Sequence, residues 1–252
     1  WEWPPPPGTI NGVEMCTLTY LPVADGFAML SSRDEMRGRG AMLEPIQDEF
    51  RKAIYPVDER SGGTWLLTSS KGFSLNLLNG GHERHDRREP YRHSRGLIPL
   101  MFAEAGSLDA FLDLFDPHGI EPFTLVVVEH SPLRVMQLVW TGEQLDVVER
   151  PAHEPSIWSS STLYDERMRD QRTAWFASFV EEPAEGAPLE ILRRFHREGG
   201  VGKAPPGERI RMKRAGGPET VCLAGVERGA DAWRLVFHDL VRERERCMRM
   251  IS

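Results

Sequence analysis

Cys16 is the residue of this sequence with the clearest potential for covalent chemistry. It follows Met15 in the segment VEMCTLTYLP, residues 13–22, where a Met–Cys pair leads into what reads as a strand. A cysteine attacks as its thiolate, and at a chain terminus its own α-amine, with a pKa of about 8, can serve as the base. Removal of Met15 would give Cys16 this arrangement. The alternative is a buried structural cysteine, which is the commoner role of a lone one.

A cluster of charges lies on the strand that is predicted to pair with the Cys16 strand. Arg33, Asp34 and Glu35 belong to the segment SSRDEM. A hairpin that turns at Asp25–Gly26 would place Cys16 near Glu35 and within one or two positions of Arg33. A guanidinium there would favour the thiolate. The alternative is that the three charges mark the end of a strand in solvent.

Asn79 is a second polar residue with a chemical interpretation. It ends the apolar segment FSLNLLN and precedes Gly80–Gly81. Its side-chain amide could be directed at a developing oxyanion, a role often worth about 10²–10³ in rate. The alternative is that Asn79 only ends the strand at the Gly-Gly turn.

Hairpin patterns surround these residues. Apolar or alternating runs on both sides of Asp25–Gly26 and of Lys71–Gly72 predict four strands before residue 80. Further strands are predicted at 123–129, 133–140, 144–149, 157–162, 219–226 and 232–240. Helices are predicted at 94–105, 107–116, 164–180 and 187–196, with Ser107 as an N-cap. The segment RERERCMRM, 242–250, has the charge pattern of a solvated tail or helix end.

The order of these elements predicts the fold. Strand hairpins with pairs of helices between them fit two stacked antiparallel sheets that are covered by helices on both outer faces. We therefore expect an α+β protein, a four-layer α-β-β-α sandwich, in a single domain over residues 15–252. Residues 1–14 are rich in Pro and Gly, so we expect a disordered leader or a removable pro-segment there.

Composition excludes several classes of function. The net charge of −7 leaves no basic surplus to neutralise phosphates, which argues against a general nucleic-acid binder. No apolar run approaches the ~20 residues of a membrane span. The cysteines, Cys16, Cys222 and Cys247, are too few for a disulfide framework, so we expect a reducing, cytoplasmic compartment.

The histidines of one polar loop have a loose metal-ligand spacing. His82, His85 and His93, with Asp86, include an H-x-x-H step. Such spacings arise easily by chance in a charged surface loop, so we expect solvated side chains and no metal.

Four segments resemble one known family. MCTLTYLP at 15–22, SSRDEM at 31–36, GGTWLLTSSKG at 62–72 and LLNGG at 77–81 look like the family of the transport and Golgi organisation protein 2. That family is also called NRDE after its Asn-Arg-Asp-Glu motif, which here reads Ser32–Arg33–Asp34–Glu35. The resemblance is specific over residues 15–100 and can be followed in element order to about residue 240. It implies the N-terminal-nucleophile hydrolase fold, which is the same α-β-β-α sandwich.

The beginning of the matched region also resembles the Cys-type choloylglycine hydrolases, which include bile salt hydrolases and penicillin V acylases. That family begins Met-Cys-Thr, carries an arginine on its second strand and has an oxyanion asparagine after a Lys-Gly hairpin. Cys16, Arg33 and Asn79 match these positions. By this resemblance Asp34 or Glu35 stands for the aspartate of that family, at a different spacing from the arginine.

Two later positions bear on this resemblance: one departs from the family's pattern, and the other matches it only by its place in the order of the elements. Ser159–Ser160 replace a Thr-Asn step that precedes the long helix in the choloylglycine hydrolases. Arg214 is the counterpart of a late basic residue of that family. The second supporting amide of the family's site is therefore missing here.

Two functions follow. The first is an N-terminal-nucleophile amide hydrolase in which Cys16 attacks an acyl carbon, Asn79 holds the oxyanion and Arg33 stabilises the thiolate or binds a substrate carboxylate. Asp34 joins the catalytic set, and the expected substrate-binding residues are Glu35, Ser160 and Arg214.

The second function is a non-catalytic carrier of haem or of a lipid-type ligand on the same scaffold, with Cys16 and His82 or His85 as ligands. The expected partner is accordingly a small-molecule acyl amide or a hydrophobic ligand. We expect no cofactor for the hydrolase, and the sequence leaves the oligomeric state open.

Overall fold

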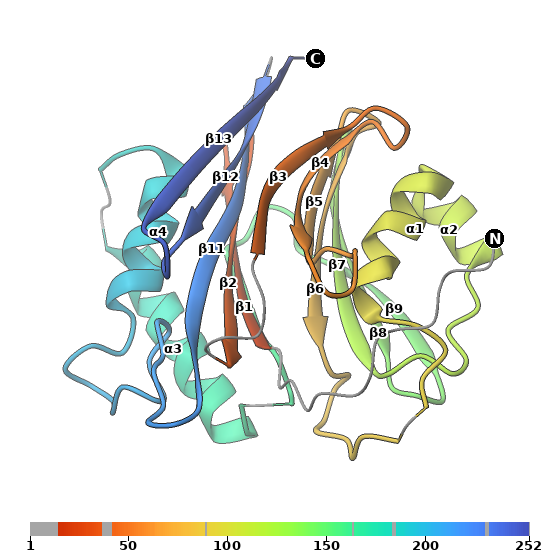
Figure 1. Ribbon diagram of the computed structural model, residues 1–252. Helices are drawn as coiled ribbons and strands as arrows, with labels where there is room; N and C mark the ends of the chain where they lie inside the picture. Colours follow the sequence, from red (N-terminus) through yellow and green to blue (C-terminus); the bar gives the residue numbers. More distant parts are fainter. Residues whose placement is uncertain are drawn as a thin grey trace.

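The computed structural model describes residues 15–36, 42–88, 90–162, 164–182, 185–229 and 232–251. The predicted leader, residues 1–14, lies outside the described residues. Two antiparallel sheets are stacked face to face, and each is covered by helices on its outer side (Figure 1). The predicted α-β-β-α sandwich is thus confirmed.

The six-stranded sheet carries Cys16 and has the order β10-β1-β2-β11-β12-β13. Its strands are β1 (Met15–Val23), β2 (Gly26–Met36), β10 (Ser156–Ser159), β11 (Pro218–Arg228), β12 (Ala232–Asp239) and β13 (Arg244–Ile251). The central position of β2 places Arg33 between two neighbouring strands, β1 and β11.

The seven-stranded sheet carries Asn79 and runs in simple sequence order from β3 to β9. Its strands are β3 (Met42–Asp48), β4 (Ala53–Asp58), β5 (Leu66–Ser69), β6 (Phe73–Asn79), β7 (Phe123–His130), β8 (Leu133–Trp140) and β9 (Leu145–Arg150). Each strand pairs with the next in the chain, so every connection within this sheet joins neighbouring antiparallel strands.

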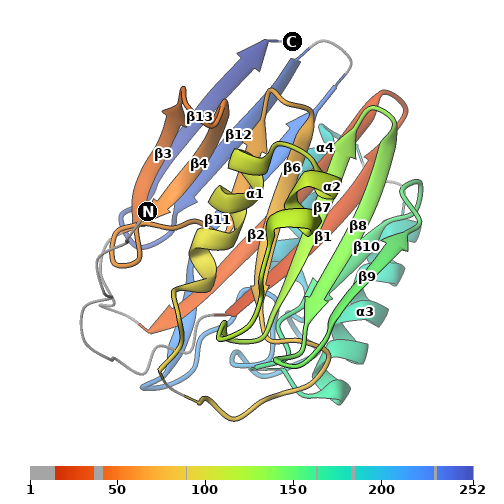
Figure 2. The same cartoon turned by 90° about the vertical axis from the view of Figure 1, so that its right-hand side faces the viewer.

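Helices form the two outer layers (Figure 2). The seven-stranded sheet is covered by η1 (Arg95–Leu97), α1 (Ile98–Ala105) and α2 (Leu108–Leu114), and the six-stranded sheet by α3 (Glu166–Glu181) and α4 (Pro188–Glu198). The predicted N-cap is confirmed, because the Ser107 hydroxyl accepts a hydrogen bond from the backbone N–H of Ala110 at 3.2 Å. None of the helices in the described ranges is long and apolar enough to cross a membrane.

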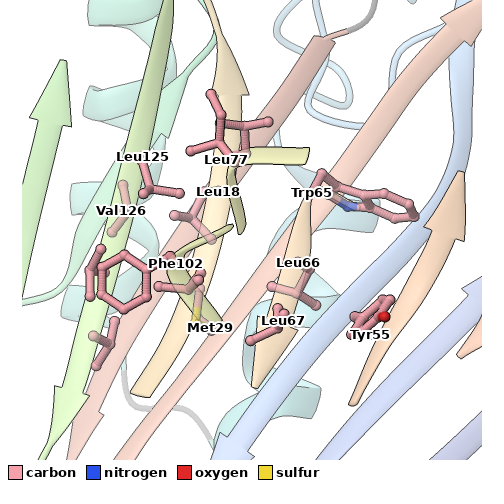
Figure 3. Packing of buried hydrophobic residues seen from close by; sticks show 14 of the residues in the cluster. Leu18, Met29, Tyr55, Trp65, Leu66, Leu67, Leu77, Phe102, Leu125 and Val126 are labelled. Carbon is pink, nitrogen blue, oxygen red and sulfur yellow. The ribbon is translucent and has the colours of Figure 1, made fainter. Parts of the chain in front are cut away.

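The main core joins the two sheets and the helices over the seven-stranded sheet. Leu18 and Met29 from the six-stranded sheet belong to the same buried cluster as Leu66, Leu125 and Val126 from the seven-stranded sheet (Figure 3). Full burial of one such side chain stabilises the fold by about 1.5–3 kcal/mol. This packing fixes the spacing of the layers on which the polar site residues lie.

Three strands were not predicted. β3 and β4 each contain a proline, Pro45 and Pro56, and the pairing shifts register between Leu43 and Ile46. Pro45 and Pro56 both lie at this shift, where the irregular pairing needs fewer backbone donors, and β3 is in addition an edge strand. The prediction of a solvated tail or helix end at 242–250 is wrong. This segment forms most of the edge strand β13, whose alternating charges remain largely exposed.

Candidate active site

Cys16 belongs to a row of side chains across the six-stranded sheet. It is the direct cross-strand neighbour of Arg33 on β2, and Arg33 is paired on its other side with Cys222 on β11. Cys16 and Arg33 are 3% and 4% exposed. Burial raises the pKa of the Cys222 thiol, and the positive charge of Arg33 opposes this rise.

The hairpin register that places Cys16 opposite Glu35 is wrong. The turn consists of Ala24 and Asp25, and Gly26 already pairs with Val23 as the first residue of β2. Gly26 is needed there for close approach, because a Cβ atom would lie 2.0 Å from the carbonyl oxygen of Arg228 on β11. The Asp-Gly pair therefore does not mark the turn centre, and the register moves Arg33 next to Cys16.

Asp58, at the end of β4, holds the guanidinium of Arg33. Its Oδ2 lies 2.5 Å from Arg33 Nη2, and its Oδ1 accepts hydrogen bonds from the backbone N–H groups of Arg60 and Ser61. The Arg33 guanidinium also lies 4.8 Å from the ring centroid of Trp65, within cation–π range. Sequence reasoning missed Asp58, and the only signal was an acidic residue shortly before the Gly62–Gly63 turn.

A small cavity brings three of the predicted site residues together. Its volume is about 20 Å³, which is room for roughly one water molecule or one carbonyl group. Its lining residues are Cys16, Arg33, Asp58, Ser61, Thr64, Trp65, Leu77, Asn79, Ser94 and Gly96. The strand pattern therefore places a thiol, a guanidinium and a side-chain amide around one space, although Asn79 belongs to the opposite sheet.

Ser160 lies beside this cavity and contacts the backbone of two of its residues. Its backbone N–H donates a hydrogen bond to the carbonyl oxygen of Cys16 at 3.1 Å. Its hydroxyl donates a hydrogen bond to the carbonyl oxygen of Asn79 at 2.5 Å. The side chain is 1% exposed and is not among the residues that line the cavity.

Asp34 lies on the opposite face of the six-stranded sheet from Arg33, as alternation along a strand requires. Its carboxylate accepts hydrogen bonds from Tyr164 and Thr220, both at 2.5 Å. Burial raises the pKa of Asp34, while these hydrogen bonds and the charges of Arg172 and Arg214 oppose the rise. The structure therefore separates Asp34 from the Cys16 cavity, contrary to its expected place in the catalytic set.

Arg172 on α3 connects this opposite face to the strand of Cys16. Its guanidinium donates hydrogen bonds to Thr17 Oγ1 at 2.6 Å and to the carbonyl oxygens of Glu208 and Arg209, and it lies 3.5 Å from the ring centroid of Tyr164. Arg172 is 1% exposed. Sequence reasoning missed Arg172, because it is one of several arginines on a charged helix.

The other two expected substrate-binding residues lie outside the cavity lining. Glu35 is on the same face of β2 as Arg33, with its carboxylate 3.8 Å from Arg33 Nη2, and it is 5% exposed. Arg214 lies in the loop before β11, where its Nε donates a hydrogen bond to the carbonyl oxygen of Gly207 at 3.3 Å. Glu35 therefore contributes charge near Arg33, and Arg214 contributes charge near Asp34.

The histidines of the polar loop contact carboxylates separately. His82 Nε2 lies 2.9 Å from Asp146, and His85 Nε2 lies 3.3 Å from Glu121. Within the part of the chain that the structure describes, no group of three or more His, Cys, Asp or Glu side chains is arranged to hold a metal ion. Neither histidine lines the cavity that contains Cys16.

Comparison with known proteins identifies related sequences and folds. A model of the Transport and Golgi organisation 2 family matches residues 15–183. No curated protein sequence matches the chain.

Two similar solved structures are hydrolases. One is a mutant of conjugated bile acid hydrolase from Clostridium perfringens, with a TM-score of 0.53 and 9% identity over 92% of each chain. The other is the Caenorhabditis elegans ortholog of N-acylethanolamine-hydrolyzing acid amidase, with a TM-score of 0.55 and 10% identity over 83% of this chain and 91% of that chain. The fold is accordingly that of the N-terminal-nucleophile hydrolases.

Proposed function

Because this chain belongs to the Transport and Golgi organisation 2 family and has the N-terminal-nucleophile hydrolase fold, we propose that it is a cysteine amide hydrolase that acts on a small-molecule acyl amide. The proposal is carried by one observation, the cavity that Cys16, Arg33 and Asn79 line together. Acyl transfer needs a nucleophile and a donor for the oxyanion, and a cation beside the thiol activates it. The names of the two similar enzymes support a substrate that contains an acyl–nitrogen bond.

The reaction would proceed through a thioester. Cys16 Sγ forms a bond to the acyl carbon while the thiol proton passes to the α-amine of Cys16. The C–N bond of the substrate then breaks, and the departing amine takes that proton. Water hydrolyses the thioester, which releases the carboxylic acid and restores the thiol.

This chemistry requires Cys16 to be the first residue. With Met15 attached, the nitrogen of Cys16 is part of a peptide bond and cannot accept a proton. The proposed active form therefore consists of the single domain from Cys16 onwards, after removal of Met15 and of residues 1–14.

The remaining cavity residues would prepare the site for this attack. The Arg33 guanidinium would favour the thiolate of its cross-strand neighbour Cys16. Asp58 and Trp65 hold that guanidinium in place. The Asn79 amide would donate to the oxyanion of the tetrahedral intermediate, where a well-placed donor is worth about 10²–10³ in rate.

The size of the cavity limits how much of a ligand can lie inside it. A volume of about 20 Å³ accommodates the reacting carbonyl group, so most of an acyl amide would lie outside this space. His82 and His85, the expected histidine ligands of a haem, do not line the cavity that contains Cys16. No observation at this site favours the carrier alternative over the hydrolase.

The cysteines fit the expected reducing compartment. All three lie within the described residues, and no disulfide joins them. We propose a cytoplasmic location on this basis.

The first test is the location and reactivity of the nucleophile. The intact mass is measured before and after brief treatment with sub-stoichiometric chloroacetamide near neutral pH, and the adduct is located by peptide mapping. We expect a chain that begins at Cys16 and that is labelled there before Cys222 or the exposed Cys247. A chain that keeps Met15 and shows no preference for Cys16 would contradict the proposed active form.

The second test is turnover of acyl 4-nitroanilides by a protein that begins at Cys16. The Cys16→Ala variant should have no turnover and an unchanged circular dichroism spectrum. Cys247→Ala serves as the matched control, because it removes an exposed thiol. Turnover by Cys16→Ala equal to that of the wild type would end the hydrolase proposal.

A further inference from the structure

We infer that Ser160 is a positioning residue that sets the place of the Asn79 amide relative to the Cys16 thiol. This inference rests on the proposed roles of Cys16 and Asn79, and it replaces the expected substrate-binding role of Ser160. The two functional groups belong to different sheets, with Cys16 on β1 and Asn79 on β6. Their relative position therefore depends on contacts that join the sheets at the cavity.

Ser160 makes such a contact with both of its hydrogen-bonding donors. Its N–H continues the pairing of β10 with β1, one residue beyond the Thr17–Ser159 pair, and binds the carbonyl oxygen of Cys16. Its hydroxyl crosses to the other sheet and binds the carbonyl oxygen of Asn79. One residue thus joins the backbones of the proposed nucleophile and the proposed oxyanion donor.

The surroundings of Ser160 hold its hydroxyl in this direction. The Ser160 Oγ also lies 3.1 Å from Thr162 Oγ1, and the residue is 1% exposed, so water does not compete for the hydroxyl. The Asn79 backbone is held independently by Gly80, whose N–H donates to the carbonyl oxygen of Pro122 at 3.0 Å. The Ser160 hydroxyl therefore binds a well-ordered backbone carbonyl, and loss of this bond would remove one of the contacts that join the two sheets at the cavity.

Loss of the Ser160 hydroxyl should change the position of the Asn79 amide more than it changes the stability of the protein. A neutral hydrogen bond contributes only about 1 kcal/mol to folding. A misplacement of about 1 Å in a reacting site can lower the rate by 10²-fold. Ser160 is not in the cavity lining, so its influence on an oxyanion would be transmitted through Asn79.

Two reactions of the same thiol separate these effects, and neither requires a free α-amine. Iodoacetamide alkylates Cys16 by displacement of iodide, so an S–C bond forms and a C–I bond breaks without an oxyanion. 4-Nitrophenyl acetate acetylates Cys16 through a tetrahedral oxyanion. There the S–C bond forms, the ester C–O bond breaks, 4-nitrophenolate leaves, and the thiol proton passes to the buffer. Both rates are measured on the full chain by mass spectrometry of the Cys16 peptide.

Ser160→Ala should lower the acetylation rate of Cys16 by about 10-fold or more while the alkylation rate stays within about 2-fold. Ser160→Thr retains the hydroxyl and should restore acetylation. Ser161→Ala is the matched control, because the hydroxyl of Ser161 also binds a backbone carbonyl, that of Glu83, at 3.0 Å. It should leave both rates unchanged.

The outcomes distinguish this inference from the proposed function. If Asn79→Ala lowers acetylation but Ser160→Ala does not, Ser160 has no positioning role and the hydrolase proposal survives. If Ser160→Ala changes both reactions equally, it acts only on the general structure around the thiol, and the inference is overturned. If Asn79→Ala leaves acetylation unchanged, the oxyanion role of Asn79 and the inference both fail.

Discussion

Arg33 and Asp58 form a buried ion pair that joins the two sheets beside Cys16. The closest atoms, Nη2 of Arg33 and Oδ2 of Asp58, lie 2.5 Å apart, and the two side chains are 5% and 11% exposed. Arg33 comes from β2 of the six-stranded sheet, and Asp58 ends β4 of the seven-stranded sheet. The opposite sheet therefore supplies a closer carboxylate to Arg33 than Glu35 on the same strand does, at 2.5 Å against 3.8 Å, whereas the adjacent Asp34 faces away from the cavity.

Removal of Asp58 should destabilise the protein strongly. Asp58→Ala leaves the buried Arg33 charge beside the more distant Glu35 carboxylate. Breaking a buried ion pair typically costs about 3–5 kcal/mol of unfolding free energy, and we expect the lower end of this range. Urea denaturation measures this loss. Glu104→Ala is the control, because Glu104 pairs with Arg51 at 45% side-chain exposure and such pairs contribute about 1 kcal/mol or less. Equal losses of unfolding free energy in the two variants would show that the buried Arg33–Asp58 pair stabilises the protein no more than an exposed pair does.

Arg172 should be essential for the packing of α3 on the six-stranded sheet. Arg172→Met removes the donor to Thr17 and to two backbone carbonyls in a fully buried place, so we expect a loss of about 3 kcal/mol or more in unfolding free energy. Arg167→Met, on the same helix with the side chain 62% exposed, should change it by less than about 0.5 kcal/mol. Urea denaturation of both variants measures these losses. A loss of less than about 1 kcal/mol for Arg172→Met would show that the hydrogen bonds of Arg172 do not stabilise the packing of α3.

Acid should destabilise the fold in part through His196. Burial, followed by the charge of Arg172, lowers the pKa of His196 from 6.5 to about 3. Since the folded protein binds this proton less readily than the unfolded chain does, the stabilising contribution is complete above pH 6.5. It is lost as the pH falls from there towards 3.

The slope of this loss is at most about 1.4 kcal/mol per pH unit for one group. Urea denaturation between pH 7 and pH 4 should therefore show a shallower pH dependence for His196→Gln than for the wild type. His153→Gln, at an exposed position, should follow the wild type. If the unfolding free energies of all three proteins fall in parallel as the pH is lowered, His196 does not contribute to the acid destabilisation.

Gly80 should resist substitution for two separable reasons. Its φ of 88° disfavours any residue with a side chain, and a Cβ atom would lie 2.2 Å from Ser161 Oγ. Gly72 has a similar φ of 95° but open space around its Cβ position. Gly72→Ala should therefore cost about 1–2 kcal/mol from the backbone alone, and Gly80→Ala should cost a further 1–3 kcal/mol, about the usual penalty of overpacking. Equal melting temperatures for the two variants would exclude the steric contribution.

The sequence was sufficient for most of the fold because its hydrophobic periodicity was clear. β6 and β8 were predicted to the residue, and β7 to within one residue, since these strands are buried and flanked by turn residues. β3, β4 and β13 were missed because they contain prolines or alternating charges. Such residues are acceptable only where a strand lies at an edge or pairs irregularly, and the sequence alone does not show which strands do so.

The candidate site was predictable only in part. Motif positions were enough to nominate Cys16, Arg33 and Asn79, which the structure brings to one cavity. Asp58 and Arg172 are far from the motif in sequence, and their roles depend on which sheet face and which helix face meet in space. The error at Asp34 has the same origin, because side-chain alternation sends consecutive residues of β2 to opposite faces.

The central position of β2 also affects how the protein is made. Arg33 pairs with β1, which is adjacent in sequence, and with β11, which begins at Pro218. During synthesis the hairpin of β1 and β2 therefore emerges long before its second neighbour and keeps an open edge through most of translation. Pairings between such distant segments form slowly. Chaperones that shield exposed strand edges should consequently matter more for the yield of this protein than its native stability would indicate.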